Sequence, residues 1–237
     1  MTPRTVIVNA DDFGASAGVN AGIVEAHAHG IVTSTSLMVT GRAATEAARL
    51  ARAHPGLSVG LHLDLDGEDA DPRVPLDDAA AVRAELAHQL GAFGRLLGRA
   101  PTHVDSHHHV HRRPELAPLV GELVAPLGVP LRGDGRVTYV GGFYAQWEWR
   151  VTELTHVSVD ALLAILRDET GPGWTEIGCH PGRVTPDFRS VYLAEREAEL
   201  ATLTDARLPP AIAALDLRLA GFADLPRLAA GDDPGPS

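Results

Sequence analysis

The fold is decided by the stretch TVIVNADDFGASAGVNAGIVEAHAHG, residues 5–30. Its first residues, Thr5–Asn9, are mostly β-branched, which predicts a buried strand. A helix is predicted from Ser16, a residue type that caps helix N-termini, to Gly30, a residue type that ends helices. A strand that runs directly into a helix is the first half of a β-α-β unit, so the chain starts as an α/β protein.

The rest of the chain repeats this alternation of short apolar runs and amphipathic stretches. The further expected strands are Ser34–Val39, Leu57–Leu63, Thr102–His107, Val129–Arg132, Glu176–Cys179 and Leu215–Leu219. The further expected helices are Arg42–Ala53, Asp78–Leu97, Pro114–Leu127, Val159–Glu169 and Leu193–Leu208. The alternation is typical of a parallel sheet or barrel, and no linker divides the chain. We predict one domain over residues 1–228 and a frayed tail over residues 229–237.

Composition excludes several classes of protein. The chain has 237 residues, 45% of them hydrophobic, which is enough for a large core and is not typical of disorder. A net charge of −11 argues against a nucleic-acid partner. No apolar run approaches the roughly 20 residues of a membrane span, and no export signal is found. The single cysteine, Cys179, excludes an internal disulfide; we expect a cytoplasmic protein and leave open whether it is a homo-oligomer.

Polar side chains suited to metal binding or proton transfer follow four of the predicted strands. They are Asp11 and Asp12 after the first strand, His62 at the end of the third, Asp105 and His107 at the end of the fourth, and His180 after Glu176–Cys179. Because the carboxyl ends of parallel strands open onto one edge, where active sites form, we expect these residues to lie together. The alternative is that each one caps a helix or lies on the surface.

The chemistry of this set favours a catalytic divalent metal site. Two imidazoles and a carboxylate, with positions left for water, are the ligands of such sites, and one cysteine cannot build a closed thiolate zinc site. Two adjacent carboxylates repel each other unless a cation or a proton gives them different roles. With a metal ion, one carboxylate binds the ion and the other acts as a base. Alternation places Asp105 on the same side as His103, His107 and His109, where it could fix the tautomer of a ligating imidazole. A histidine-rich run can also be an adventitious metal-binding surface.

Five motifs make the sequence similar to a known family. In chain order they are VNADDFG (8–14), GIVTSTS (30–36), GLHL (60–63), PTHVDSHHHVH (101–111) and CHPG (179–182). Together they resemble the YdjC-like carbohydrate deacetylases, which include the chitooligosaccharide deacetylases and are distantly similar to the polysaccharide deacetylases of the NodB type. The resemblance runs from about Thr5 to Gly182, and the first and fourth motifs are its most specific parts.

The resemblance implies a distorted (β/α) barrel with fewer than eight regular strands. It implies that Asp11 is the general base and His180 the general acid. One divalent metal ion, Mg²⁺ or Zn²⁺, would be held by Asp12, His62 and His107; the ligand types suit zinc. Arg132, in Pro-Leu-Arg after the fifth predicted strand, looks like the arginine that supports the base in such enzymes.

The implied activity is hydrolytic removal of an acetyl group from an N-acetylated amino sugar or oligosaccharide. One alternative keeps the metal centre but acts on a glycolipid or another small acylated amine. Phosphoester hydrolysis is disfavoured because two-metal phosphatases use more bridging carboxylates. A metal- or sugar-binding module without activity is the remaining alternative. The segment after His62 is short and acidic and the stretch after Arg132 differs in character, so the sequence does not specify the sugar.

Residues 133–153 have no clear period but hold five of the eleven aromatic residues of the chain. These are Tyr139, Phe143, Tyr144, Trp147 and Trp149. Loops over barrel rims carry specificity, and aromatic faces stack on the C–H faces of sugars, so we expect Tyr144 or Trp147 to bind substrate. The alternative is that these rings pack the loop onto the barrel or form a subunit contact.

Overall fold

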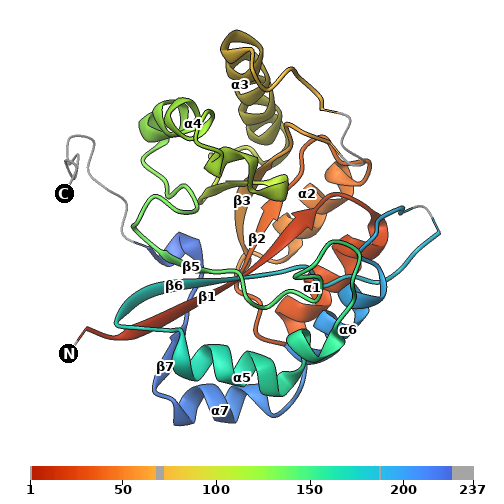
Figure 1. The fold of residues 1–237 in the computed structure, drawn as a ribbon, viewed down its shortest axis with the longest axis vertical. Helices are drawn as coiled ribbons and strands as arrows, with labels where there is room; N and C mark the ends of the chain where they lie inside the picture. The colour runs from red at the N-terminus through yellow and green to blue at the C-terminus, as the bar shows by residue number, and fades with distance from the viewer. Residues whose placement is uncertain (1, 68–71, 187, 226–237) are drawn as a thin grey trace.

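A curled parallel sheet forms the centre of the molecule (Figure 1). The computed structural model describes residues 2–67, 72–186 and 188–225. The strands are β1 Arg4–Phe13, β2 Ser34–Leu37, β3 Ser58–Leu63, β4 Val104–Ser106, β5 Thr138–Val140, β6 Gly173–Cys179 and β7 Leu217–Leu219. They pair in parallel in the order β4-β3-β2-β1-β6-β5, and β7 pairs with the first residues of β1.

Helices surround this sheet. They are α1 Ala17–His29, α2 Ala44–Ala53, α3 Ala79–Leu97, α4 Ala117–Val124, α5 Val159–Asp168, α6 Ala194–Leu203 and α7 Leu208–Ala214. Successive contacts run from α4 through α3, α2 and α1 to α6, and α5 packs against α7 below the sheet (Figure 1). The arrangement confirms a single-domain, distorted (β/α) barrel with parallel strands. No helix in the described ranges is both long and apolar enough to cross a membrane.

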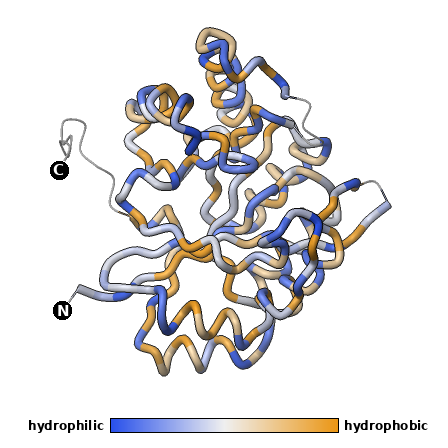
Figure 2. The backbone as a smooth tube through the Cα atoms, in the orientation of Figure 1, coloured by the Kyte–Doolittle hydropathy of each residue, from blue (hydrophilic) through white to orange (hydrophobic). Residues whose placement is uncertain are grey.

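Burial explains why these segments form these elements. All residues of β1 after Arg4 are buried, as expected for a central parallel strand covered on both faces. Figure 2 shows hydrophobic residues concentrated where β1 and β6 cross the centre of the molecule. The Ser16 side chain accepts a hydrogen bond from the backbone N–H of Val19, so it caps α1 as predicted. The polar residues at the carboxyl end of β1, Asp11 and Asp12, are buried with the apolar residues of the strand.

Three sequence-based expectations are corrected or fall outside the described part. The expected strand Val129–Arg132 makes only an isolated bridge, between Leu131 and Val104, and the fifth strand instead lies at Thr138–Val140, in the segment without a period. The expected helix Leu193–Leu208 ends at Leu203, and a second helix that was not expected, α7, begins at Leu208, where prolines in the first turn favour a helix start. The expected tail, residues 229–237, lies outside the described residues.

Candidate active site

A β-bulge at the end of β1 turns both carboxylates into the barrel. Ala10 pairs with Thr35 of β2, but the next pair is Phe13 with Leu37, so β1 has one extra residue here. Asp12 has a φ of +69°, a left-handed conformation that Asp tolerates better than most residues. Successive residues of a regular strand point to opposite faces, and a bulge re-aims one of them. Asp11 and Asp12 can therefore both serve one site.

The structure brings Asp12, His62 and His107 together, although they come from three different strand ends. Oδ1 of Asp12 lies 3.3 Å from Nε2 of His62 and 3.2 Å from Nδ1 of His107. All three residues are buried, and one ligand atom from each lies within 4.8 Å of the others. This group could hold a metal ion, and it is the set that the resemblance predicts.

The hydrogen bonds around this group fit a divalent cation. Nδ1 of His62 lies 2.8 Å from Oδ1 of Asp105, so Nε2 is the ring nitrogen that faces Asp12, and the neighbouring carboxylates raise the pKa of this imidazole although burial opposes the shift. Oδ1 of Asp12 is buried and takes no hydrogen bond from the described residues. A lone pair of imidazole and a carboxylate oxygen repel each other unless a proton or cation lies between them. A carboxylate that orients an imidazole in this way is the arrangement found behind metal-ligating histidines.

Asp11 faces the same space but is held by different partners. Its two oxygens accept hydrogen bonds from both terminal nitrogens of Arg132, at 2.7 and 2.8 Å, and Asn9 donates to Oδ1 at 2.8 Å. Burial would raise the pKa of Asp11, but the Arg132 guanidinium outweighs it and holds that pKa well below the ordinary value. Asp11 is therefore ionised and fixed in place beside Asp12.

Arg132 itself is anchored by two further carboxyl groups. Its Nε and Nη2 donate to Oε1 of Glu176 on β6, and Nη2 lies 2.8 Å from Oδ2 of Asp105. The ring of Tyr139 lies 4.7 Å from the guanidinium carbon. Burial raises the pKa of Glu176 to about 7, although Arg132 opposes the shift. Arg132 and Asp105 are the supports expected from the sequence, whereas Glu176 is a residue of the site that the sequence does not reveal.

His180 follows β6 and faces Asp11 from the other side. Its Nε2 lies 3.9 Å from Oδ2 of Asp11, and its Nδ1 lies 3.9 Å from Oε1 of the buried Glu199 on α6. The backbone N–H of His180 donates to Glu199 as well, and Tyr192 donates to the same carboxyl group. Burial lowers the pKa of His180 to about 4, although Asp11 and Asp12 oppose the shift.

Helix α6 supplies two residues of the site that sequence analysis missed. Besides Glu199, it supplies Arg196, whose Nη2 lies 2.6 Å from Oδ2 of Asp12. Nη1 of Arg196 donates to the backbone oxygen of His180 at 3.4 Å. Arg196 therefore occupies one oxygen of Asp12 and leaves the other for His62 and His107. The sequence offered one signal for these residues. Arg196 and Glu199 are three residues apart on α6, so they lie on the same side of the helix, and both are buried.

The aromatic loop, residues 133–153, places Tyr144 against His180 and Trp147 on the surface. The ring of Tyr144 stacks on Tyr192 at 4.6 Å and lies edge-on to His180 at 5.3 Å. Trp147 stacks on His156 at 3.8 Å, and 68% of its surface is exposed. Tyr144 therefore lines the side of the site that holds His180, whereas Trp147 offers an open aromatic face on the surface of the loop.

The fold and this site define a (β/α) barrel with a buried Asp/His centre at the carboxyl ends of its strands. The model of the family described as YdjC-like protein matches residues 5–214. The chain therefore belongs to the YdjC-like family, which confirms the resemblance carried by the five motifs. A chitooligosaccharide deacetylase of Escherichia fergusonii is 36% identical over 258 residues, which cover 94% of this chain and 99% of that protein.

Solved structures agree with this assignment. A protein of Enterococcus faecalis V583, provisionally named for cellobiose-phosphate cleavage, matches with a TM-score of 0.78 and 27% identity, covering 93% of this chain and 98% of that one. A family 4 carbohydrate esterase of Streptomyces lividans, in complex with acetate, matches with a TM-score of 0.58 and 16% identity, covering 92% and 93%. The second likeness shows a shared fold, which confirms the distant similarity to the NodB-like group at that level.

Proposed function

We propose that the protein is a metal-dependent hydrolase that removes the acetyl group from an N-acetylated amino sugar or oligosaccharide. The observation that carries the proposal is the buried oxygen of Asp12, which faces His62 and His107 while Asp11 and His180 flank it. The names of the relatives support a carbohydrate deacetylase. Asp12, His62 and His107 would hold one divalent ion, Mg²⁺ or Zn²⁺.

A divalent ion, when bound, polarises a carbonyl group and makes a nearby water more acidic. The residues of the chain do the rest. Asp11, ionised and held by Arg132, takes the proton of the attacking water. Because a fixed base loses no orientation when the reaction starts, the support by Arg132 contributes to the rate. The acetyl carbon gains the water oxygen, and its bond to the amine nitrogen breaks.

The leaving amine needs a proton, because an amide anion is too basic to depart unaided. His180 is neutral near pH 7, since burial holds its pKa at about 4. It must therefore receive the proton that it donates. Nε2 of His180 lies 3.9 Å from Oδ2 of Asp11, so the proton that Asp11 removes from water can pass to His180 and then to the nitrogen. Acetate and a free amino sugar result.

The test is acetate release from a panel of N-acetylated sugars by metal-stripped protein to which single metals are returned. We expect no acetate from the stripped protein and restored release when one equivalent of a suitable ion is added, with Zn²⁺ bound more tightly than Mg²⁺. Asp12→Ala should bind neither ion in calorimetry and release no acetate. Full activity of the stripped protein would contradict metal dependence, and release from acylated lipids alone would change the substrate class.

The aromatic loop should bind the part of the substrate beyond the scissile amide. We expect Trp147→Ala to raise KM for an acetylated oligosaccharide by about 2- to 10-fold, since an aromatic stacking contact contributes about 0.5–1.5 kcal/mol. KM for a monosaccharide should change little. Tyr144→Ala, beside His180, should raise KM for both substrates. Steady-state kinetics on both substrates measures these effects.

A matched control exists on the same loop. Trp149 is as exposed as Trp147, 69% against 68%, and each ring has one face covered, by Arg150 and by His156 respectively. Trp149→Ala therefore removes a ring of the same size and exposure that is not proposed to bind substrate, and it should leave both KM values unchanged. If Trp147→Ala instead lowers thermal stability or alters the oligomeric state and affects both substrates equally, the ring supports the loop or a subunit contact. Unchanged kinetics and stability would remove Trp147 from the site.

A further inference from the structure

The histidines that follow β4 are His107, His108, His109 and His111, and each has a different partner. His107 faces Asp12 in the candidate metal centre. His109 lies 3.2 Å from the hydroxyl of Tyr139, whose ring packs on Arg132. His111 lies 2.9 Å from the backbone oxygen of Arg132. These three therefore serve the interior of the site or its supports, and only His108 of the run remains without such a role.

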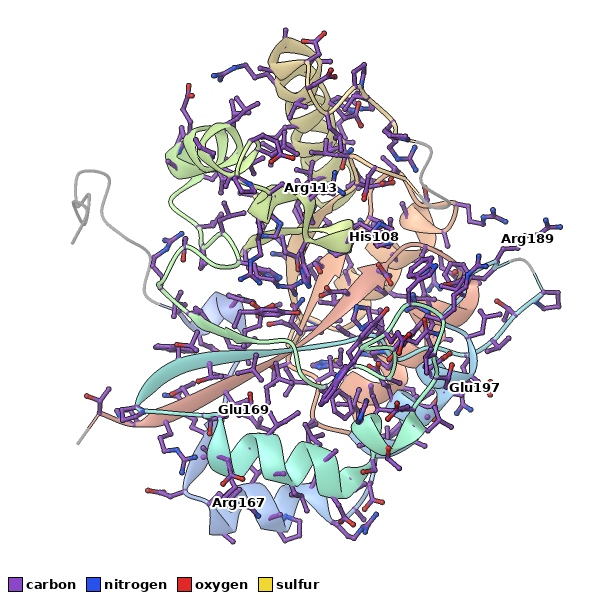
Figure 3. All side chains as sticks on the ribbon, in the orientation of Figure 1. His108, Arg113, Arg167, Glu169, Arg189 and Glu197 are labelled. Atoms are coloured by element: carbon purple, nitrogen blue, oxygen red, sulfur yellow. The ribbon has the colours of Figure 1, made fainter. Side chains whose placement is uncertain are left out.

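His108 turns outward and pairs with Asp66. Its Nδ1 lies 3.0 Å from Oδ2 of Asp66, and 45% of its side chain is exposed. Its ring still lies 3.8 Å from that of His107, so it borders the candidate metal centre directly. In Figure 3, His108 lies beside the carboxyl end of β1, and Arg113 lies beyond it toward α3. The pair therefore lies at the solvent-exposed edge of the candidate metal centre.

The backbone is strained to achieve this placement. His108 and His109 have φ values of +48° and +53°, two consecutive left-handed residues without a glycine. A left-handed conformation is unfavourable for a residue with a Cβ atom, and strain of this kind gathers at functional sites, where surrounding contacts maintain it. A regular continuation of β4 would alternate the rings between the two faces of the sheet. The left-handed turn instead puts His107 inside and His108 at the rim, side by side.

We propose that His108, oriented by Asp66, binds a hydroxyl group of the amino sugar next to the scissile amide and so helps to set substrate specificity. This inference rests on the proposed function. When Nδ1–H of His108 donates to Asp66, its Nε2 carries a lone pair that can accept a hydrogen bond from a sugar hydroxyl. Oδ1 of Asp66 is buried, so the acceptor offered to the substrate is Nε2 of the partly exposed His108.

The experiment compares His108→Leu and His108→Gln with the wild type, each loaded with the same metal. Leu fills similar space without a polar atom, whereas Gln keeps a polar group near the position of Nε2. We expect His108→Leu to raise KM for the acetylated sugar about 3- to 10-fold, the effect of one lost hydrogen bond to a ligand, and kcat to stay within about twofold. His108→Gln should recover part of the loss, and Asp66→Asn should behave as a weaker form of His108→Leu.

Two readouts separate substrate binding from support of the metal centre. Metal affinity by calorimetry and hydrolysis of 4-nitrophenyl acetate, which has no sugar, should equal the wild type in His108→Leu. His88→Leu is the control, because His88 is an exposed histidine on α3 whose side chain pairs with Glu85. It should change none of these quantities.

Several results would overturn the inference. Weakened metal binding in His108→Leu, or equal loss on the ester and the sugar, would make His108 a support for His107. An unchanged KM for the sugar would show that His108 does not touch it. Failure of the proposed function is visible separately, because the wild type would then release no acetate from any sugar, and this inference would fall with it.

Discussion

Asp11→Asn is expected to lower kcat by about 10²- to 10⁴-fold while the protein keeps its metal, because the change removes the general base and leaves the proposed ligands in place. Asn has nearly the size of Asp and can still accept a hydrogen bond from Arg132 through its oxygen. The other carboxyl partners of Arg132, Asp105 and Glu176, remain, so the guanidinium is not left unpaired. Stopped-time acetate assays and metal titration on the same preparation measure both quantities.

The matched variant is Asp12→Asn, one residue further along the bulge. It should lose metal affinity as well as turnover, because Asp12 is the only carboxylate of the proposed ligand set. Thermal unfolding of both proteins without metal shows whether either change disturbs the fold. If Asp11→Asn abolished metal binding and Asp12→Asn spared it, the roles of the two carboxylates would have to be exchanged.

The repeated strand and helix pattern was enough to predict a parallel sheet or barrel, because buried parallel strands and amphipathic helices have distinct periods, whereas the distorted barrel was implied by the family resemblance. It could not place β5. That strand has three residues, and at this length a period cannot be recognised. The expected strand at Val129–Arg132 had the right composition, but the structure uses it as a single bridge that carries Arg132 to the site. Local sequence predicts which residues prefer strands, and tertiary pairing decides which of them form one.

Most candidate site residues could be located because they follow strands, whose carboxyl ends meet at one rim. The reason that Asp11 and Asp12 share a site was not visible in the sequence. It depends on the bulge against β2, which is a property of the pairing between two strands. Glu199 and Arg196 were missed for another reason. They lie within a helix, and a charged residue in a helical pattern normally indicates the solvent-exposed face.

The second large effect is expected at His180. His180→Ala should lower kcat by about 10²- to 10⁴-fold and change KM much less, because a proton donated to the leaving nitrogen stabilises the transition state and not the bound substrate. Metal affinity should be unchanged, since His180 lies near Asp11 and Glu199 and outside the proposed ligand set. Glu199→Gln, which keeps a hydrogen-bond acceptor beside the backbone N–H of His180, should give a smaller loss of kcat.

The leaving group separates proton donation from positioning. An activated aryl ester expels a weakly basic oxygen that needs no proton, whereas an amide expels an amine that does. His180→Ala should therefore lose much more activity on the acetylated amino sugar than on the aryl acetate, and the ratio of the two losses measures the contribution of the donated proton. Equal losses on the two substrates would show that His180 positions the acetyl group instead, and the proton of the leaving amine would then have to come from another residue or from water.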